Sequence, residues 1–154
     1  MRKGVALATL WLASATVAWA GEGADQTLAA FRPQLPPEMA ALLRAADPAK
    51  GEAIFMRKCS ACHDHKKEGG NGKGPHLWNL FGRTAATVPG FDYSAAMRKS
   101  SHTWDFATLD YYLIQPDRAV PGLLMIFRGL PKDAERADLL AFLRLLNDLP
   151  PPLP

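Results

Sequence analysis

Both cysteines of the sequence lie in one short stretch, Cys59-Ser60-Ala61-Cys62-His63. Two thiols separated by two residues can form a disulfide, act as a redox dithiol or bind a metal ion. A thioredoxin-type dithiol needs a βαβ pattern around it, and the flanking sequence has none. A zinc site would also need two of the histidines, and these lack the usual paired spacing: His63, His65, His76 and His102.

A histidine directly after the second cysteine favours a fourth interpretation, the covalent attachment of a haem of the c type. The two thiols would add across the two vinyl groups at one porphyrin edge. A helical turn lets Cys59 and Cys62 both reach that edge, and His63 then presents its imidazole to the iron. The stretch therefore predicts one covalent haem c.

The iron of such a haem needs a second axial ligand from a distant part of the chain, and Met125 is the best candidate. It lies in the stretch "VPGLLMIFRGL", after Pro121-Gly122 and before the last predicted helix. A methionine among apolar residues is often only core filling, but a thioether beside the iron would raise the haem potential. The other candidates are expected to pack rather than bind iron: Met39, Met56 and Met97 in predicted helices, His65, His76, and His102 in a polar turn.

The first twenty residues have the composition of a targeting segment. Arg2 and Lys3 precede an apolar run over residues 5–20, which ends in Ala18-Trp19-Ala20. A basic start, an apolar run and a small-x-small end are typical of a secretory signal, here cleaved before Gly21. The run is shorter than the ~20 apolar residues that a spanning helix needs, so an uncleaved anchor is the less favoured alternative. We therefore expect a periplasmic protein, in agreement with haem attachment outside the cytoplasm.

The charge gives no reason to expect nucleic-acid binding. The chain has 18 basic and 15 acidic residues, and loss of Arg2 and Lys3 with the signal leaves 16 against 15, a net charge of +1. The sequence holds no basic run with interleaved aromatic residues.

The remaining 134 residues are enough for one domain. Residues 21–47 form a Pro/Ala-rich N-terminal extension, partly helical after Pro37, which would either pack on the domain or dock a partner. The domain itself spans residues 48–149, and the Pro-rich tail 150–154 is expected to be extended and loose.

The helix signals within the domain are local. Asp47 precedes Pro48 as an N-cap, so a helix should begin there and end near the cysteines. Residues 66–75 are polar and glycine-rich, which predicts a loop. A second helix carries Leu109, Tyr112 and Leu113 and should stop at Pro116, and the clearest helix spans residues 133–147. No segment alternates as a strand does, so the fold class is all-α.

From residue 51 to residue 146 the sequence resembles the class I c-type cytochromes, of the mitochondrial cytochrome c and bacterial cytochrome c2 type. The similar motifs follow one another in the family's order: "CSACH", "GKGPHLWNLFGR", "PGFDYSAAM", "WDFATLDYYLIQP", "VPGLLMIFRGL" and "ERADLLAFLRLL". The resemblance implies the cytochrome c fold, a few short helices wrapped around one covalently bound haem.

The resemblance also implies roles for single residues. Cys59 and Cys62 would form the thioethers, with His63 and Met125 as axial ligands of the haem iron. The carbonyl of Pro75 would accept a hydrogen bond from His63. The remaining haem-binding residues would be Arg83, Tyr93 and Trp104 around the propionates, Tyr112 beside the sulfur of Met125, and Phe127 over the exposed haem edge. Gly51 would allow the first and last helices to cross closely, where Phe55 would meet Leu139 and Phe142.

Four positions depart from the family pattern. Met97 and Leu123 stand where many members have asparagine and threonine, so two polar groups near the haem are missing. Asp117 and Leu124 fall where lysine is common, so the positive ring around the haem edge is thinned.

The predicted function is that of a soluble, monomeric one-electron carrier and not of an enzyme. Its donor would be a bc1 complex or a periplasmic dehydrogenase, and its acceptor a terminal oxidase or a peroxidase. Two alternatives belong to other classes: a haem enzyme or gas sensor in which Met125 leaves the iron, and a docking subunit that residues 21–47 hold to one redox complex.

Overall fold

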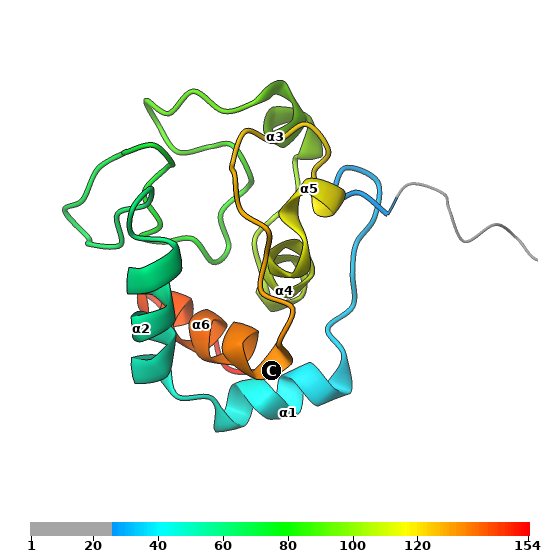
Figure 1. Ribbon diagram of the computed structural model, residues 1–154, viewed down its shortest axis with the longest axis vertical. Helices are drawn as coiled ribbons and strands as arrows, with labels where there is room; N and C mark the ends of the chain where they lie inside the picture. Colours follow the sequence, from blue (N-terminus) through cyan, green and yellow to red (C-terminus); the bar gives the residue numbers. More distant parts are fainter. Residues whose placement is uncertain (1–25) are drawn as a thin grey trace, which may run out of the picture.

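The computed structural model describes residues 26–154, so the predicted signal segment lies outside the described residues. Within residues 26–154 the chain forms helices and no strand, apart from one isolated antiparallel bridge between Thr84 and Thr103. The all-α prediction is confirmed. The six helices of this part of the chain are α1 (Pro37–Ala45), α2 (Pro48–Lys58), α3 (Ala95–Ser100), α4 (Phe106–Ile114), α5 (Pro116–Ala119) and α6 (Asp133–Leu145) (Figure 1).

Helix α2 begins at Pro48 with Asp47 as its N-cap, as the sequence predicted. The carboxylate of Asp47 accepts a hydrogen bond from the backbone N–H of Ala49 at 2.9 Å, and Pro48 needs no partner for its nitrogen. The backbone N–H of Asp47 in turn donates to the carboxylate of Asp138 in α6 at 2.8 Å. This pair joins the beginning of α2 to α6.

Helices α2 and α6 pack against each other (Figure 1). The rings of Phe55 and Phe142 lie 5.5 Å apart, and Leu139 is fully buried. At the crossing, a Cβ atom added to Gly51 would lie 2.0 Å from the backbone oxygen of Asp138. The close crossing expected at Gly51 is confirmed, since no residue with a side chain fits there.

Helix α4 carries Leu109, Tyr112 and Leu113 and ends before Pro116, as predicted. Asp105 and Thr108 form a reciprocal capping box at its start. The helix ends at Ile114, but Pro116 also opens the short helix α5, because a proline is well suited to a first helical turn.

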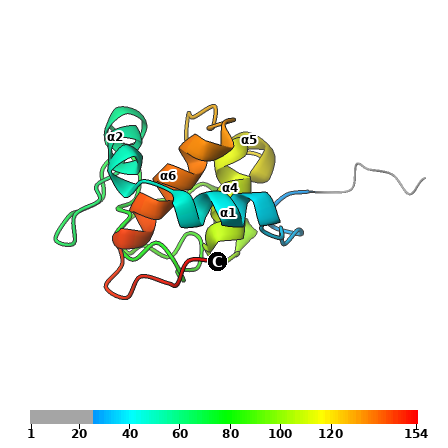
Figure 2. The ribbon, with the colours of Figure 1, turned by 90° about the horizontal axis from the view of Figure 1, so that it is seen from below.

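The described part of the extension, residues 26–47, packs on α4, α5 and α6. The backbone N–H of Leu28 donates to the carbonyl of Ala119 in α5 at 2.8 Å, and the Tyr111 hydroxyl in α4 donates to the carbonyl of Gln26 at 2.6 Å. Helix α1 lies beside α6 (Figure 2), and its side chains Met39 and Leu43 are buried. Leu28, Met39 and Leu43 therefore share one hydrophobic core with the helices that follow.

The C-terminal tail is extended, but it is not loose. Arg144 donates to the carbonyl of Pro151, and Arg44 of α1 donates to the carbonyl of Pro154, so the chain ends beside α1 (Figures 1 and 2). The expectation of a loose tail, which rested on its proline content, was wrong because two arginines bind the tail's carbonyl groups.

The turn that holds His102 is polar and exposes Ser101 and Thr103, but the His102 side chain itself is buried. His102 is 1% exposed, and its ring meets the ring of Trp104 edge-on at 4.1 Å. Polar neighbours in the sequence, Ser100, Ser101 and Thr103, suggested a surface turn, but the pairing of residues 82–85 with 102–104 draws the ring inward. No helix in residues 26–154 has the length and apolar content needed to cross a membrane.

Candidate functional site

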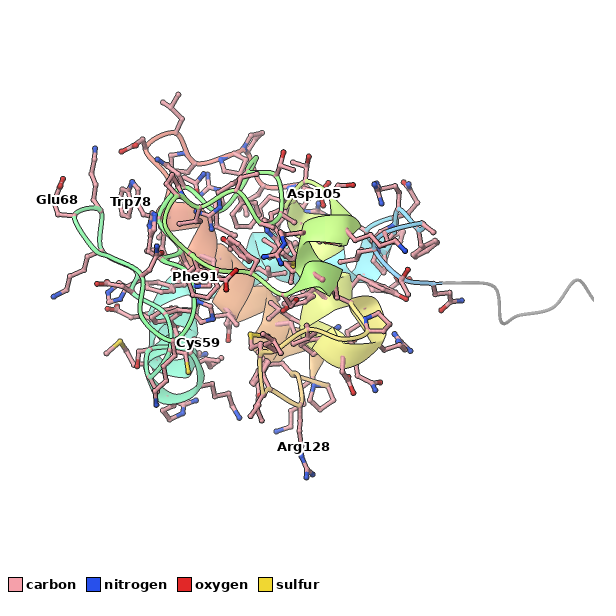
Figure 3. All side chains as sticks on the ribbon, turned by 90° about the horizontal axis from the view of Figure 1, so that it is seen from above. Cys59, Glu68, Trp78, Phe91, Asp105 and Arg128 are labelled. Carbon is pink, nitrogen blue, oxygen red and sulfur yellow. The ribbon has the colours of Figure 1, made fainter. Side chains whose placement is uncertain are left out.

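The cysteine motif forms a helical turn that continues beyond α2. The backbone N–H of Cys59 closes on the carbonyl of Phe55 at 2.8 Å, and the N–H groups of Cys62 and His63 both donate to the carbonyl of Cys59 at 3.0 Å. Because the turn is held by these bonds, two thiols and an imidazole are presented from one short segment. Cys59, which Figure 3 labels, is half-buried.

Both cysteines are free thiols in the described chain, so no disulfide joins them. Burial raises the pKa of the Cys59 thiol to about 11, against a small opposing effect of Lys58. The thiol is therefore neutral at neutral pH, and residues 26–154 hold no group of three or more His, Cys, Asp or Glu side chains that could bind a metal ion. The zinc alternative has no support in this geometry.

The His63 imidazole is fixed on two sides. Its Nδ1 lies 2.7 Å from the carbonyl oxygen of Pro75, to which it can only donate. Burial lowers the pKa of His63, so the ring is neutral and its Nε2 keeps a lone pair that can bind a metal. A Cβ atom on Gly74 would lie 2.4 Å from the ring's Cε1, so only glycine leaves room for the imidazole there.

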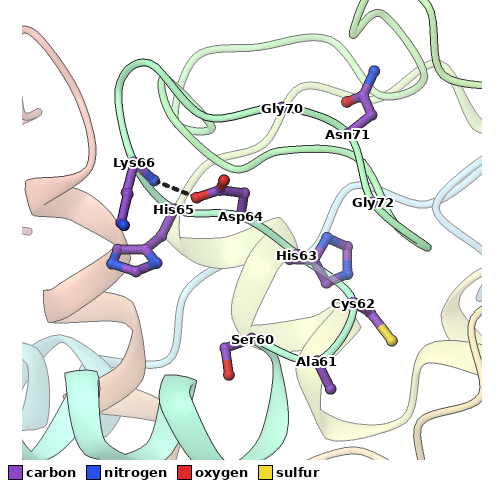
Figure 4. A pocket seen from close by; sticks show the side chains of 10 residues that line it. All are labelled: Ser60, Ala61, Cys62, His63, Asp64, His65, Lys66, Gly70, Asn71 and Gly72. Atoms are coloured by element: carbon purple, nitrogen blue, oxygen red, sulfur yellow. Dashed lines mark hydrogen bonds between the residues drawn. The ribbon is translucent and has the colours of Figure 1, made fainter.

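The loop that carries Gly74 and Pro75 is itself held in place. Gly74 donates its N–H to the carbonyl of Cys62 at 2.8 Å, and Asp64 accepts from the N–H of Lys66 at 2.9 Å (Figure 4). Asn71 donates to the carbonyl of Pro89 at 2.9 Å, which ties this loop to the next one. A hollow of about 460 Å³ borders the motif here, between residues 60–66 and 70–72 (Figure 4).

A second group of site residues lies at the short antiparallel pairing around the Thr84–Thr103 bridge. The backbone N–H of Trp104 donates to the carbonyl of Arg83 at 2.9 Å, which brings the two residues side by side. The Arg83 guanidinium donates to the carbonyls of His76 and Trp78 at 3.2 and 3.1 Å, and burial lowers its pKa. None of the carboxylates in residues 26–154 forms an ion pair with this half-buried cation.

A third group of site residues comes from α4 and from the methionine segment, residues 120–130. The hydroxyl of Tyr112 lies 3.8 Å from the sulfur of Met125, within reach of a weak O–H to sulfur hydrogen bond. The segment returns to α4 through the N–H of Leu130, which donates to the carbonyl of Leu113 at 2.7 Å. Gly129 has φ +93°, and a Cβ atom there would lie 2.1 Å from the carbonyl oxygen of Ile114, so the return requires glycine.

The cysteine motif and these two groups of residues enclose one mostly apolar cavity of about 550 Å³. All the sequence-predicted site residues line it: Cys59, Cys62, His63, Pro75, Arg83, Tyr93, Trp104, Tyr112, Met125 and Phe127. Burial raises the pKa of Tyr93 and of Tyr112, so both hydroxyls stay protonated donors at neutral pH. His65, His76 and His102 do not line the cavity.

Sequence reasoning placed Met97 and Leu123 near the haem but missed most of the cavity's apolar walls. Leucines from two helices and two loops line it, together with Phe91, Met97 and the aromatic side chains named above: Leu77, Leu80, Leu109, Leu113, Leu123, Leu139 and Leu143. The signal for the helical leucines was the stripe of apolar residues in α4 and α6. The stripe indicated that these leucines are buried. It did not indicate that some of them line a cavity while others pack on neighbouring side chains.

The cavity fits a haem attached to the cysteines. Two thiols and a metal-binding imidazole stand at its wall, and its lining is mostly apolar. Arg83, which pairs with no carboxylate of residues 26–154, offers a cation to the porphyrin's acidic groups. The fold and this site define a protein of the c-type cytochrome class.

Comparison with known proteins agrees with this class. Residues 48–147 match the family model for cytochrome c, and the chain belongs to that family. It is 48% identical to cytochrome c of Chlamydomonas reinhardtii over 100 residues, which cover 65% of this chain and 89% of that protein. It is 42% identical to a cytochrome c homolog of Bradyrhizobium diazoefficiens over 114 residues, or 73% of this chain and 61% of that protein.

Membership of this family establishes the general function. The chain carries one covalent haem c, with Cys59 and Cys62 at the positions of the attachment motif, and it belongs to a family of electron carriers that act with redox partners. Other similar proteins include cytochrome c of Ulva intestinalis, 46% identical over 98 residues, or 64% of this chain and 88% of that protein.

Proposed function

We propose that this chain is a monomeric periplasmic one-electron carrier whose haem iron is bound by His63 and Met125. The observation that carries the proposal is the convergence of a neutral imidazole and a thioether on one cavity from segments far apart in the sequence. The haem supplies a one-electron couple, and the protein supplies its two axial ligands and a water-poor surrounding.

The residues around the cavity have distinct parts in this proposal. Cys59 and Cys62 hold the haem covalently, and Pro75 orients His63 through the 2.7 Å contact at Nδ1. Arg83, Tyr93 and Trp104 offer hydrogen-bond donors to the propionates. Because both axial positions are filled by protein atoms, no substrate binds the iron, which favours a carrier over an enzyme or a gas sensor.

The test of ligation is an optical spectrum of the haem-containing protein in both oxidation states, including the weak near-infrared band of sulfur-to-iron ligation. Met125→Ala should remove the band, lower the potential and allow carbon monoxide to bind, while the haem stays attached. Met97→Ala is the matched control, because Met97 also lines the cavity but belongs to α3, and this variant should keep the band. Loss of the band in Met97→Ala, or an intact protein that is high-spin and binds carbon monoxide, would contradict the proposal.

The cellular part of the proposal rests on the sequence of residues 1–20. Export with cleavage before Gly21 predicts a periplasmic protein whose measured mass begins at that residue. Recovery of the intact chain in the membrane fraction would instead mean that the apolar run stays as an anchor. The proposed donors are a bc1 complex or a periplasmic dehydrogenase, and the proposed acceptors a terminal oxidase or a peroxidase.

A further inference from the structure

The methionine segment, residues 120–130, is held mainly at its two ends. At its start the backbone N–H of Val120 donates to the carbonyl of Pro116 in α5 at 2.9 Å, and at its end the N–H of Leu130 donates to the carbonyl of Leu113 in α4 at 2.7 Å. Between these ends, residues 124–129 form no backbone–backbone hydrogen bond within the described part of the chain. The position of Met125 therefore depends on how firmly the two ends are held.

The N-terminal extension holds the end at α5. Leu28 is fully buried, and its backbone N–H donates to the carbonyl of Ala119, the last residue of α5, at 2.8 Å. The carbonyl of Leu28 accepts a hydrogen bond from the guanidinium of Arg32 at 2.6 Å. Leu28, Ala119 and Val120 belong to one hydrophobic core. Figure 1 shows the first described residues of the extension beside α5, so the extension contacts the chain directly before the methionine segment.

Helix α4 contacts the extension and the methionine segment through neighbouring residues. The Tyr111 hydroxyl donates to the carbonyl of Gln26 at 2.6 Å, and the Tyr111 ring lies 5.5 Å from the ring of Phe31. The hydroxyl of the next residue, Tyr112, lies 3.8 Å from the sulfur of Met125. The extension thus joins α4, which contacts the sulfur, to α5, from which the methionine segment starts.

We propose that Leu28 is a positioning residue for the iron ligand Met125. The inference rests on the proposed binding of the iron by His63 and Met125. Helix α5 has only four residues and needs tertiary contacts to stay folded. Leu28 supplies a buried side chain and a backbone hydrogen bond at this helix, and so keeps the start of the methionine segment at the cavity. Loss of the side chain favours an open form, in which the sulfur has left the iron.

The test is the binding of imidazole to the oxidised, haem-containing protein, followed by its optical spectrum. Imidazole replaces the sulfur of Met125, so one iron–sulfur bond breaks, one iron–nitrogen bond forms and no electron is transferred. Because imidazole binds only molecules whose methionine segment is open, its apparent association constant reports the open fraction. The constant should rise at least about tenfold in Leu28→Ala, since truncation of a buried leucine commonly costs more than the roughly 1.4 kcal/mol that corresponds to tenfold.

The matched control is Leu43→Ala. Leu43 is also a buried leucine of the extension, but it belongs to α1, which packs on α6. This variant should lose about as much stability toward denaturant as Leu28→Ala, whereas its imidazole constant should change less than about threefold. A conservative variant, Leu28→Met, keeps most of the buried volume and should stay within about threefold of the native constant.

A second readout needs no added ligand. The amide hydrogens of Val120 and Leu123, which bond to the carbonyls of Pro116 and Val120, should exchange with solvent at least about tenfold faster in Leu28→Ala. Their exchange should change little in Leu43→Ala. Nuclear magnetic resonance of the haem-containing protein measures both.

The outcomes separate this inference from the proposed function. Equal imidazole constants in Leu28→Ala and Leu43→Ala, or unchanged amide exchange at Val120 in Leu28→Ala, would overturn the positioning role of Leu28. Both variants should keep the near-infrared sulfur band in the absence of imidazole, because the closed form still predominates. A native protein without that band would instead overturn the proposed ligation by Met125, and its spectrum detects this before any variant is made.

Discussion

Gly51 in α2 lies directly against the backbone carbonyl of Asp138 in α6, with room for a hydrogen and not for a methyl group. Because the obstacle is backbone, Gly51→Ala can be accommodated only if the two helices move apart. We expect the free energy of unfolding to fall by about 3 kcal/mol, at the upper end of overpacking in a core. Denaturant unfolding followed by far-ultraviolet circular dichroism measures this change.

Gly70→Ala is the control for that substitution. A Cβ atom at Gly70 meets no atom within 4 Å, so the free energy of unfolding should change by no more than about 0.5 kcal/mol. Equal effects of the two substitutions would mean that the close approach of α2 and α6 does not limit the packing.

Arg136 of α6 and Asp110 of α4 form a buried ion pair, in which the Arg136 Nε donates to the carboxylate at 2.7 Å. Burial raises the pKa of Asp110, and the hydrogen bond and charge of Arg136 oppose that rise. Arg136→Met leaves a buried carboxylate without its cation, so the free energy of unfolding should fall by about 3–5 kcal/mol. The double variant Arg136→Met/Asp110→Leu should recover most of this loss, because it removes the unpaired charge. A double variant as unstable as Arg136→Met alone would show that packing, and not charge pairing, sets the effect.

Tyr112→Phe removes the hydroxyl that lies 3.8 Å from the sulfur of Met125. If Met125 binds the iron, the positive end of that O–H favours the reduced haem, so the midpoint potential should fall in the variant. A weak hydrogen bond of about 0.5–1 kcal/mol corresponds to a fall of about 20–40 mV. Redox titration measures the shift. Tyr111→Phe is the control, because the Tyr111 hydroxyl donates to the carbonyl of Gln26. The midpoint potential of this variant should equal that of the native protein.

Helices α2, α4 and α6 could be predicted because signals close to them in the sequence specify them, whereas α5 was not predicted. Asp47 caps α2 and the Asp105–Thr108 box caps α4, and each bond joins residues two or three apart in the chain. The burial of His102 and the fixed C-terminal tail could not be predicted in this way. Both depend on partners far away in the sequence, such as Arg44 for Pro154.

More of the candidate site could be predicted from the family resemblance than from the physical chemistry of its residues. The motif from Cys59 to His63 indicates haem attachment through its own spacing, but only the family resemblance selected Arg83, Tyr93 and Trp104. The placement of Arg83 beside Trp104 depends on the pairing of residues 82–85 with 102–104. Those hydrogen bonds are between backbone groups, which leave no pattern of side chains to read.

His102 should make the protein less stable in acid. Burial first, and the charge of Arg32 second, lower the pKa of His102 to about 4, with Asp105 opposing, and neither ring nitrogen has a hydrogen-bond partner within the described residues. The ring is neutral in the folded state and takes up a proton more readily when unfolded. Its contribution is therefore fully present above pH ~6.5 and is lost as the pH falls through ~4. Between pH ~7 and pH ~4.5 the native protein should lose about 2 kcal/mol more free energy of unfolding than His102→Leu, by denaturant titration at both pH values. A difference between the two proteins that is the same at both pH values would mean that His102 is already protonated in the folded protein or titrates alike in both states.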